Sequence, residues 1–128
     1  MRYLHTMIRV GNLEKSIKFY SEGLGFQVVK RADYEDGKFT LVFLQSTRGA
    51  SSSEPLLELT YNWGVSEYEI GAGYGHMAYE VASMKETIES LRKAGYDLSW
   101  GPKLDPSGKR AMAFITDPDG YKIELLEA

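Results

Sequence analysis

Two stretches of the chain alternate apolar and polar residues, and they contain its only two histidines. Residues 4–10 read LHTMIRV and residues 75–81 read GHMAYEV. Alternation with a period of two is typical of a β-strand that buries one face. His5 and His76 fall at the same place in the two stretches, 71 residues apart. The sequence therefore predicts two related strands and indicates an internal repeat.

Each predicted strand is followed by a segment with helical periodicity. Asn12 is a suitable N-cap for the first helix, whose apolar positions recur every three or four residues. The second helix is expected to begin after Ser83, since Glu86 three positions later completes a capping-box pattern. Gly95 stands where a left-handed residue commonly ends a helix.

Three further runs of strand character follow each helix. They cover residues 25–29, 40–44 and 56–60 in the first half and residues 95–99, 111–115 and 122–126 in the second. The last pair is only 66 residues apart, because the Ser- and Gly-rich loop at 46–55 replaces a tight Asp-Pro-Asp-Gly turn. We therefore predict an α+β fold of two βαβββ repeats with curved mixed sheets, forming one domain over 1–128. Repeat one covers about 1–61, the linker about 62–74 and repeat two about 75–128.

Composition narrows the functional classes. The chain has 128 residues, 43% of them hydrophobic, and a net charge of −3 with scattered basic residues, so nucleic acid is not an expected partner. Cysteine is absent, which excludes disulfides, a thiolate nucleophile and Cys-based metal sites. The sequence contains neither a signal-peptide pattern nor an apolar run of membrane-spanning length, so we expect a cytoplasmic protein without membrane contacts.

Two carboxylates stand in equivalent strands of the two halves. Glu58 lies between leucines in the last strand of repeat one, and Glu124 occupies the matching place in repeat two. Burying a carboxylate is costly unless it has a cationic partner. One interpretation is a divalent-metal site made of His5, His76 and these two glutamates, with nitrogen and oxygen ligands that suit Ni, Co, Zn, Mn or Fe. The other is a pair of ordinary strand histidines beside solvated glutamates; the repeated placement favours the metal.

These four residues stand in segments that resemble the glyoxalase I family of the vicinal oxygen chelate superfamily, in its short bacterial form. The most specific segments are LHTMIRVGNLEKSIKFY, LELTYNWG, YGH and FITDPDGYKIEL. The resemblance implies that His5, Glu58, His76 and Glu124 bind the metal, with Ni(II) preferred and Co(II) or Zn(II) as alternatives. It also implies a homodimer whose sites are built within one chain or across two.

The reaction implied by the resemblance isomerises the hemithioacetal of methylglyoxal and glutathione to S-lactoylglutathione. A proton next to a carbonyl is removed, so the charge of the resulting enediolate needs stabilisation, which a divalent cation can provide. A carboxylate must carry the proton between adjacent carbons. By resemblance Glu124 is the principal base, while Glu58 can serve the opposite substrate enantiomer.

Substrate contacts are expected on the same strands and in one loop. Arg9 and Asn62 match family positions that contact the γ-glutamyl end of glutathione, although a surface ion pair and a turn would also explain them. Lys109 and Arg110, together with Lys103, are candidates to hold the glycyl carboxylate, or are simply solvated. Longer relatives carry an arginine where this chain has Ala72.

Other activities remain open at this point. A methylmalonyl-CoA epimerase-like enzyme would use the same four ligands and the same proton transfer. An extradiol dioxygenase fits less well, because its iron is held by two histidines and one carboxylate. A metal-free protein that sequesters an antibiotic would not need the four ligands at all.

Overall fold

The computed structural model describes residues 1–46 and 53–128. Within these residues the chain forms two compact units, Met1–Tyr68 and Glu69–Ala128, which are described separately below. The loop predicted at 46–55 lies largely outside the described residues. The single domain over 1–128 stays a prediction.

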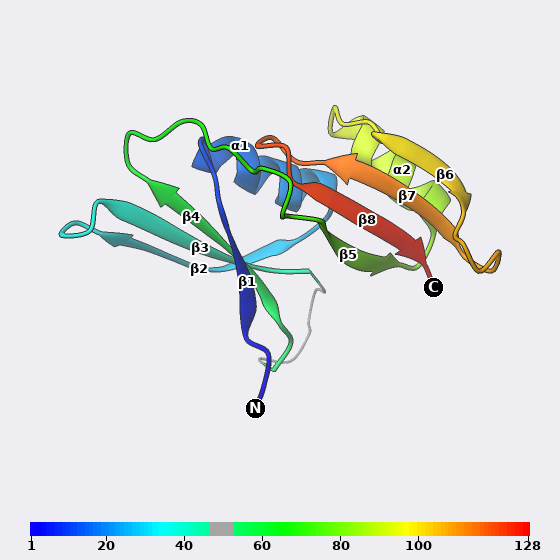
Figure 1. Cartoon of the computed structure of the whole chain (residues 1–128), viewed down its shortest axis with the longest axis horizontal. Helices are drawn as coiled ribbons and strands as arrows, with labels where there is room; N and C mark the ends of the chain where they lie inside the picture. Colours follow the sequence, from blue (N-terminus) through cyan, green and yellow to red (C-terminus); the bar gives the residue numbers. More distant parts are fainter. Residues whose placement is uncertain (47–52) are drawn as a thin grey trace. The chain divides into compact units, whose positions relative to one another are not determined.

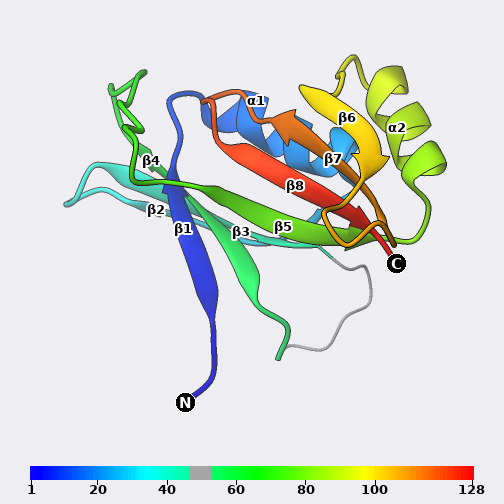
Figure 2. The same cartoon turned by 45° about the vertical axis from the view of Figure 1, so that its right-hand side comes forward.

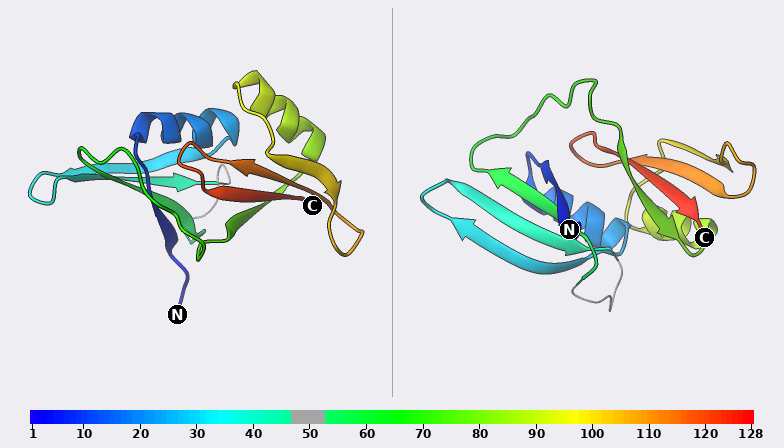
Figure 3. Two further views of the ribbon diagram at one scale, coloured as in Figure 1. Left: turned by 45° about the horizontal axis from the view of Figure 1, so that its top comes forward. Right: turned by 60° about the horizontal axis from the view of Figure 1, so that its bottom comes forward.

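The first unit contains one four-stranded mixed sheet with the strand order β1-β4-β3-β2 (Figure 1). Strand β1 pairs with β4 in parallel, and the other neighbours are antiparallel. The left view of Figure 3 shows α1 above β2 and β3, on one face of the sheet. The elements are β1 (His5–Arg9), α1 (Leu13–Lys18), the π-helical turn η1 (Phe19–Gly23), β2 (Gln27–Tyr34), β3 (Phe39–Gln45) and β4 (Leu56–Asn62).

The second unit repeats this topology with the order β5-β8-β7-β6, again with its first and last strands parallel (Figure 2). Its elements are β5 (His76–Val81), α2 (Met84–Lys93), β6 (Trp100–Leu104), β7 (Ala111–Thr116) and β8 (Lys122–Glu127). The predicted α+β class and its two βαβββ repeats are confirmed. In the described residues no helix is long and apolar enough to cross a membrane.

Each helix packs on the last strand of its own unit, since α1 contacts β4 and α2 contacts β8. Leu57 and Leu59 of β4 are buried, as are Ile123 and Leu125 of β8. Burying a side chain of this size stabilises the fold by about 1.5–3 kcal/mol. The alternating leucines therefore anchor one face of each sheet under a helix and leave the other face for polar residues.

The helix ends explain one irregularity of the repeat. The side chains of Asn12 and Ser83 cap their helices by accepting backbone N–H bonds from Lys15 at 3.0 Å and Glu86 at 3.3 Å, as predicted. The first helix then widens into η1, which adds one residue before the left-handed Gly25 (φ 77°). The second helix stays α-helical and ends at Gly95 (φ 91°). One extra residue in η1 therefore accounts for a separation of 70 here and 71 elsewhere.

The predicted strand at 95–99 is wrong, because β6 begins only at Trp100. The backbone after α2 closes the helix instead: the Tyr96 N–H donates to the Leu91 carbonyl at 2.9 Å. The run predicted at 25–29 belongs to a strand that begins at Gln27 and continues to Tyr34, because its pairing with β3 extends that far.

Candidate functional site

Each unit brings one histidine against one glutamate. His5 Nε2 lies 2.7 Å from Glu58 Oε2, and His76 Nε2 lies 3.4 Å from Glu124 Oε2. The register is the same in both sheets, since Glu58 stands opposite Met7 and Glu124 opposite Ala78, two residues after each histidine. The repeat therefore produces two imidazole–carboxylate pairs of matching geometry.

Burial differs between the partners of each pair. The side chains of Glu58 and Glu124 are 11% and 16% exposed, whereas those of His5 and His76 are 37% and 43% exposed. A carboxylate with so little access to water needs a donor, and the imidazole N–H supplies it. Each pair thus presents a partly open imidazole edge and a sheltered acid.

A phenylalanine supports each imidazole, and the search for ligands in the sequence missed both. The rings of His5 and Phe43 meet edge to face at 5.6 Å, and those of His76 and Phe114 at 5.4 Å. Phe43 stands opposite Glu58 in the sheet, as Phe114 stands opposite Glu124. The 71-residue separation of the two phenylalanines was the available signal. Edge-to-face packing restricts the imidazole planes.

Beyond the phenylalanines the two units differ. The Lys30 ammonium lies 5.8 Å from the Phe43 ring centroid in the first unit. In the second unit Trp100 takes the position opposite Phe114, with the rings 5.9 Å apart, and Lys103 lies 5.3 Å from a Trp100 ring. One pair is therefore flanked by a bare cation and the other by an indole with a cation on it.

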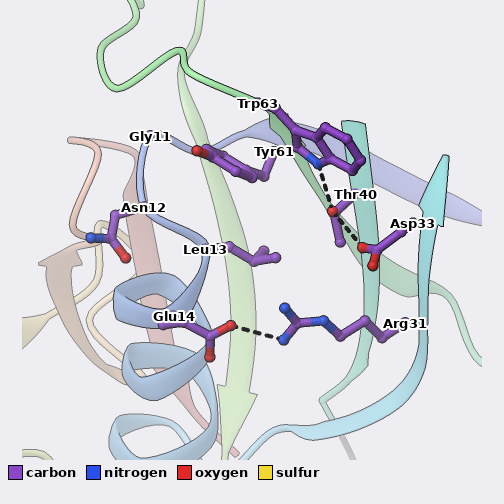
Figure 4. A pocket seen from close by; sticks show the side chains of 9 residues that line it. All are labelled: Gly11, Asn12, Leu13, Glu14, Arg31, Asp33, Thr40, Tyr61 and Trp63. Atoms are coloured by element: carbon purple, nitrogen blue, oxygen red, sulfur yellow. Dashed lines mark hydrogen bonds and ion pairs between the residues drawn. The ribbon is translucent and has the colours of Figure 1, made fainter. Parts of the chain in front are cut away.

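A cavity of about 530 Å³ opens on the opposite face of the first sheet, beside the start of α1 (Figure 4). Its strand residues Asp33, Thr40 and Tyr61 alternate with those that carry the histidine–glutamate pair, so the cavity and the pair lie on different faces. The cavity is lined by Gly11, Asn12, Leu13, Glu14, Arg31, Asp33, Thr40, Tyr61 and Trp63.

Sequence comparison assigns the chain to a family. The description "Glyoxalase/Bleomycin resistance protein/Dioxygenase superfamily" matches residues 2–125. The chain belongs to this superfamily. A lactoylglutathione lyase from Haemophilus influenzae is 44% identical over 127 residues, which is 99% of this chain and 93% of that protein.

Solved structures agree with this assignment to the glyoxalase superfamily. The trypanothione-dependent glyoxalase I of Leishmania major superposes with a TM-score of 0.84 at 48% identity, covering 99% of this chain and 86% of that one. Glyoxalase I from Zea mays superposes with a TM-score of 0.92 at 36% identity, covering 99% of this chain and 44% of the longer maize chain. The chain therefore resembles glyoxalase I enzymes over nearly its whole length.

Membership in the glyoxalase I group implies a divalent metal, and each histidine–glutamate pair fits one. Two ligands at right angles around an ion, each about 2.0–2.2 Å from it, lie about 3 Å apart. The observed donor separations of 2.7 Å and 3.4 Å bracket that value. Across residues 1–46 and 53–128, no three His, Asp or Glu side chains gather into a metal-binding group. Each unit thus supplies two donors.

The predicted substrate residues lie in varied surroundings. Arg9 is exposed on the strand face of His5. The Asn62 amide donates to the Tyr68 hydroxyl at 3.0 Å. The backbone N–H of Lys109 donates to Asp105 at 3.1 Å. Arg110 forms an ion pair with Glu80 at 2.8 Å, and its Nε donates to the Glu127 carbonyl at 2.7 Å. A role for Arg110 in binding a carboxylate would therefore compete with its ion pair.

Two other groups in the second unit have shifted pKa values. Burial, with smaller contributions from Asp117 and Tyr121, raises the pKa of the Tyr74 phenol. The hydroxyl of Tyr74 has no hydrogen-bond partner among the residues described. The hydrogen bond donated by Ser107, aided by backbone N–H bonds, lowers the pKa of the Asp105 carboxyl.

Proposed function

We propose that this chain is a lactoylglutathione lyase of the short bacterial type. It would isomerise the hemithioacetal of methylglyoxal and a thiol to the corresponding S-lactoyl thioester. The observation that carries the proposal is the repeated imidazole–carboxylate pair, His5 with Glu58 and His76 with Glu124. Relatives that cover nearly all of the chain and carry this name support it.

The four paired residues have distinct tasks in this proposal. His5 and His76 hold the metal throughout, because a neutral imidazole is a good ligand and is already oriented by a phenylalanine. The metal, when bound, acts as a Lewis acid and a template for the two substrate oxygens. We propose one divalent ion per site held by all four residues, with nickel as the preferred ion and cobalt or zinc as alternatives.

The glutamates move the proton. Glu124 is proposed as the principal base, which takes the proton next to the carbonyl and returns it to the neighbouring carbon. Glu58 would perform the same transfer for the opposite substrate enantiomer. Low exposure supports this role, because a partly desolvated carboxylate is a stronger base than one in water.

Arg9 and Asn62 are proposed to bind the γ-glutamyl end of the thiol, and Lys109 and Arg110 its glycyl carboxylate. We further propose a homodimer in the cytoplasm, with both βαβββ repeats in one glyoxalase-type domain. The thiol itself is the least constrained part of the proposal, because a relative at 48% identity is named for trypanothione.

One assay tests the enzyme assignment. Metal-free protein is mixed with Ni(II), Co(II) or Zn(II) and with the hemithioacetal of glutathione or trypanothione, and thioester formation is followed by absorbance. We expect activity with nickel above that with zinc. The absence of isomerisation with every metal and both thiols would contradict the proposal.

The alternatives predict other outcomes. An epimerase would leave the hemithioacetals unchanged but would exchange the α-proton of a methylmalonyl thioester. A metal-free antibiotic-binding protein would do neither and would retain full ligand binding in the presence of a chelator. The named relatives favour the lyase over both.

A further inference from the structure

The turn after β4 is held in place from two sides. The backbone N–H of Trp63 donates to the Lys38 carbonyl at 2.9 Å, and the Lys38 ammonium lies 5.6 Å from a Trp63 ring. The indole Nε1–H donates to Thr40 Oγ1 at 2.9 Å (Figure 4). Trp63 is thereby fixed through its backbone, its ring face and its indole N–H.

Thr40 connects this indole to a carboxylate. Its hydroxyl donates its single proton to Asp33 Oδ1 at 2.7 Å, so a lone pair is left to accept the bond from Trp63 (Figure 4). Thr40 is only 4% exposed, and the bond to a charged acceptor is stronger than a neutral one. Asp33 therefore sets the orientation of the hydroxyl, and the hydroxyl sets the orientation of the indole.

Asn62 immediately precedes Trp63 and lies on the other side of the strand. It shares the sheet face of Glu58, whereas Tyr61 and the Asp33–Thr40 pair belong to the opposite face. Its carbonyl accepts the Val65 N–H at 3.0 Å, and its amide donates to Tyr68 at 3.0 Å. A movement of Trp63 would therefore shift the Asn62 side chain directly.

The sheet itself does not require this chain of hydrogen bonds. In the second unit Leu104 stands opposite Ala111, in the register that Asp33 and Thr40 occupy in the first. Two apolar side chains serve there, in a sheet with the same strand order. The carboxylate and the hydroxyl are thus a feature of the first unit alone, and a task specific to that unit explains them.

We infer that the chain Asp33–Thr40–Trp63 is a positioning device that holds Asn62 for the γ-glutamyl end of the thiol and so contributes to thiol specificity. The inference rests on the proposed function. Asp33, Thr40 and Trp63 act through Asn62 and do not touch the reacting atoms. Their loss should weaken recognition of the γ-glutamyl group and leave proton transfer unchanged.

The test compares Thr40→Val with Thr40→Ser. Valine keeps the shape of the side chain but can neither donate to Asp33 nor accept from Trp63, whereas serine can do both. With the glutathione hemithioacetal we expect Thr40→Val to raise KM roughly five- to tenfold at unchanged kcat, as expected for one lost hydrogen-bonded link. Thr40→Ser should restore the wild-type KM.

A truncated thiol makes the test specific. Cysteinylglycine lacks the γ-glutamyl group, so Thr40→Val should have the same KM as wild type with its hemithioacetal. The matched control is Thr87→Val, which removes a hydroxyl that donates to the Ser83 carbonyl at 2.8 Å in the second unit and should leave both KM values unchanged.

A double variant separates a linked chain from general damage. Trp63→Phe keeps an aromatic ring but removes the indole N–H, and it should raise KM as Thr40→Val does. Thr40→Val/Trp63→Phe should be no worse than either single change, because both break one link. Thermal unfolding and bound nickel, measured on every variant, show that the fold and the metal site are retained.

Three results would overturn the inference while the proposed function stands. They are an unchanged KM for glutathione in Thr40→Val, an equal rise with both thiols, and additive effects in the double variant. A wild-type protein that is inactive with every thiol and metal would instead overturn the proposed function, and the inference with it.

Discussion

The two units of this chain share one structural motif and differ around it. Each unit places an imidazole, a carboxylate and a phenylalanine at matching positions of its sheet. Around that shared trio the side chains diverge: Lys30 has Trp100 as its counterpart, and Thr40 has Ala111. The comparison indicates that the ligand positions are constrained equally in both units, whereas the surroundings are free to serve different ends of one substrate.

The largest expected effect comes from removing a shared ligand. His5→Ala and His76→Ala should each weaken nickel binding by at least about 100-fold, because even partners of ligands cost 10- to 100-fold. Equilibrium dialysis against nickel measures this. If the two units contribute equally, the two variants should match; nickel retained at wild-type affinity in either would remove that histidine from the proposed site.

The glutamates should break the equivalence of the units in turnover. Glu124→Gln is expected to lower kcat about 100-fold or more and to retain some metal, since it removes a base and keeps an oxygen ligand. Glu58→Gln should affect mainly the opposite enantiomer of the hemithioacetal. Single-enantiomer kinetics check this, and activity within a few-fold of wild type for both variants would argue against carboxylate bases.

A smaller difference concerns the helix starts. Glu127 Oε2 accepts the Met84 N–H at 2.6 Å in the second unit, while Tyr61 occupies the matching strand position in the first. Glu127→Ala should lower the free energy of unfolding by about 1 kcal/mol, the usual value of a helix-capping bond. Glu127→Gln, which keeps an acceptor, is the control in urea unfolding, and equal losses would show that the bond itself contributes little.

The smallest expected effect is on acid stability. Because the hydrogen bond from Ser107 lowers the pKa of Asp105 in the folded chain, the resulting stabilisation is present above the unfolded pKa and is lost as pH falls through the folded pKa. Ser107→Ala should move the pKa of Asp105 upward toward its ordinary value. Carboxyl titration by NMR measures this shift, and an unchanged titration would assign the lowering to the backbone N–H bonds.

Much of this architecture could be predicted from the order of residues. Alternation identified β1 and β5, cap residues identified both helix starts, and equal spacing paired His5 with His76 and Glu58 with Glu124. The start of β6 could not be predicted, because residues 95–99 have strand composition but a backbone that closes α2. A helix terminus is decided by hydrogen bonds that local composition does not reveal.

The network behind Asn62 was also beyond prediction. Asp33, Thr40 and Trp63 are scattered along the chain and become neighbours only through the pairing of β2, β3 and β4. Their individual residue types carry no special signal. The phenylalanines behind the histidines are an intermediate case, since their repeat spacing was visible but phenylalanine in a strand is ordinarily packing.

The wider turn at Phe19–Gly23 gives the chain an unusual tolerance. Deleting one residue there, such as Ser21, would leave the first helix with as many residues between its cap and its glycine as the second helix has. The segment would close as a plain α-helix, and β2 would keep its phase against β3. A one-residue gap in this turn is thus a length change that the fold can absorb without disturbing a single strand partner.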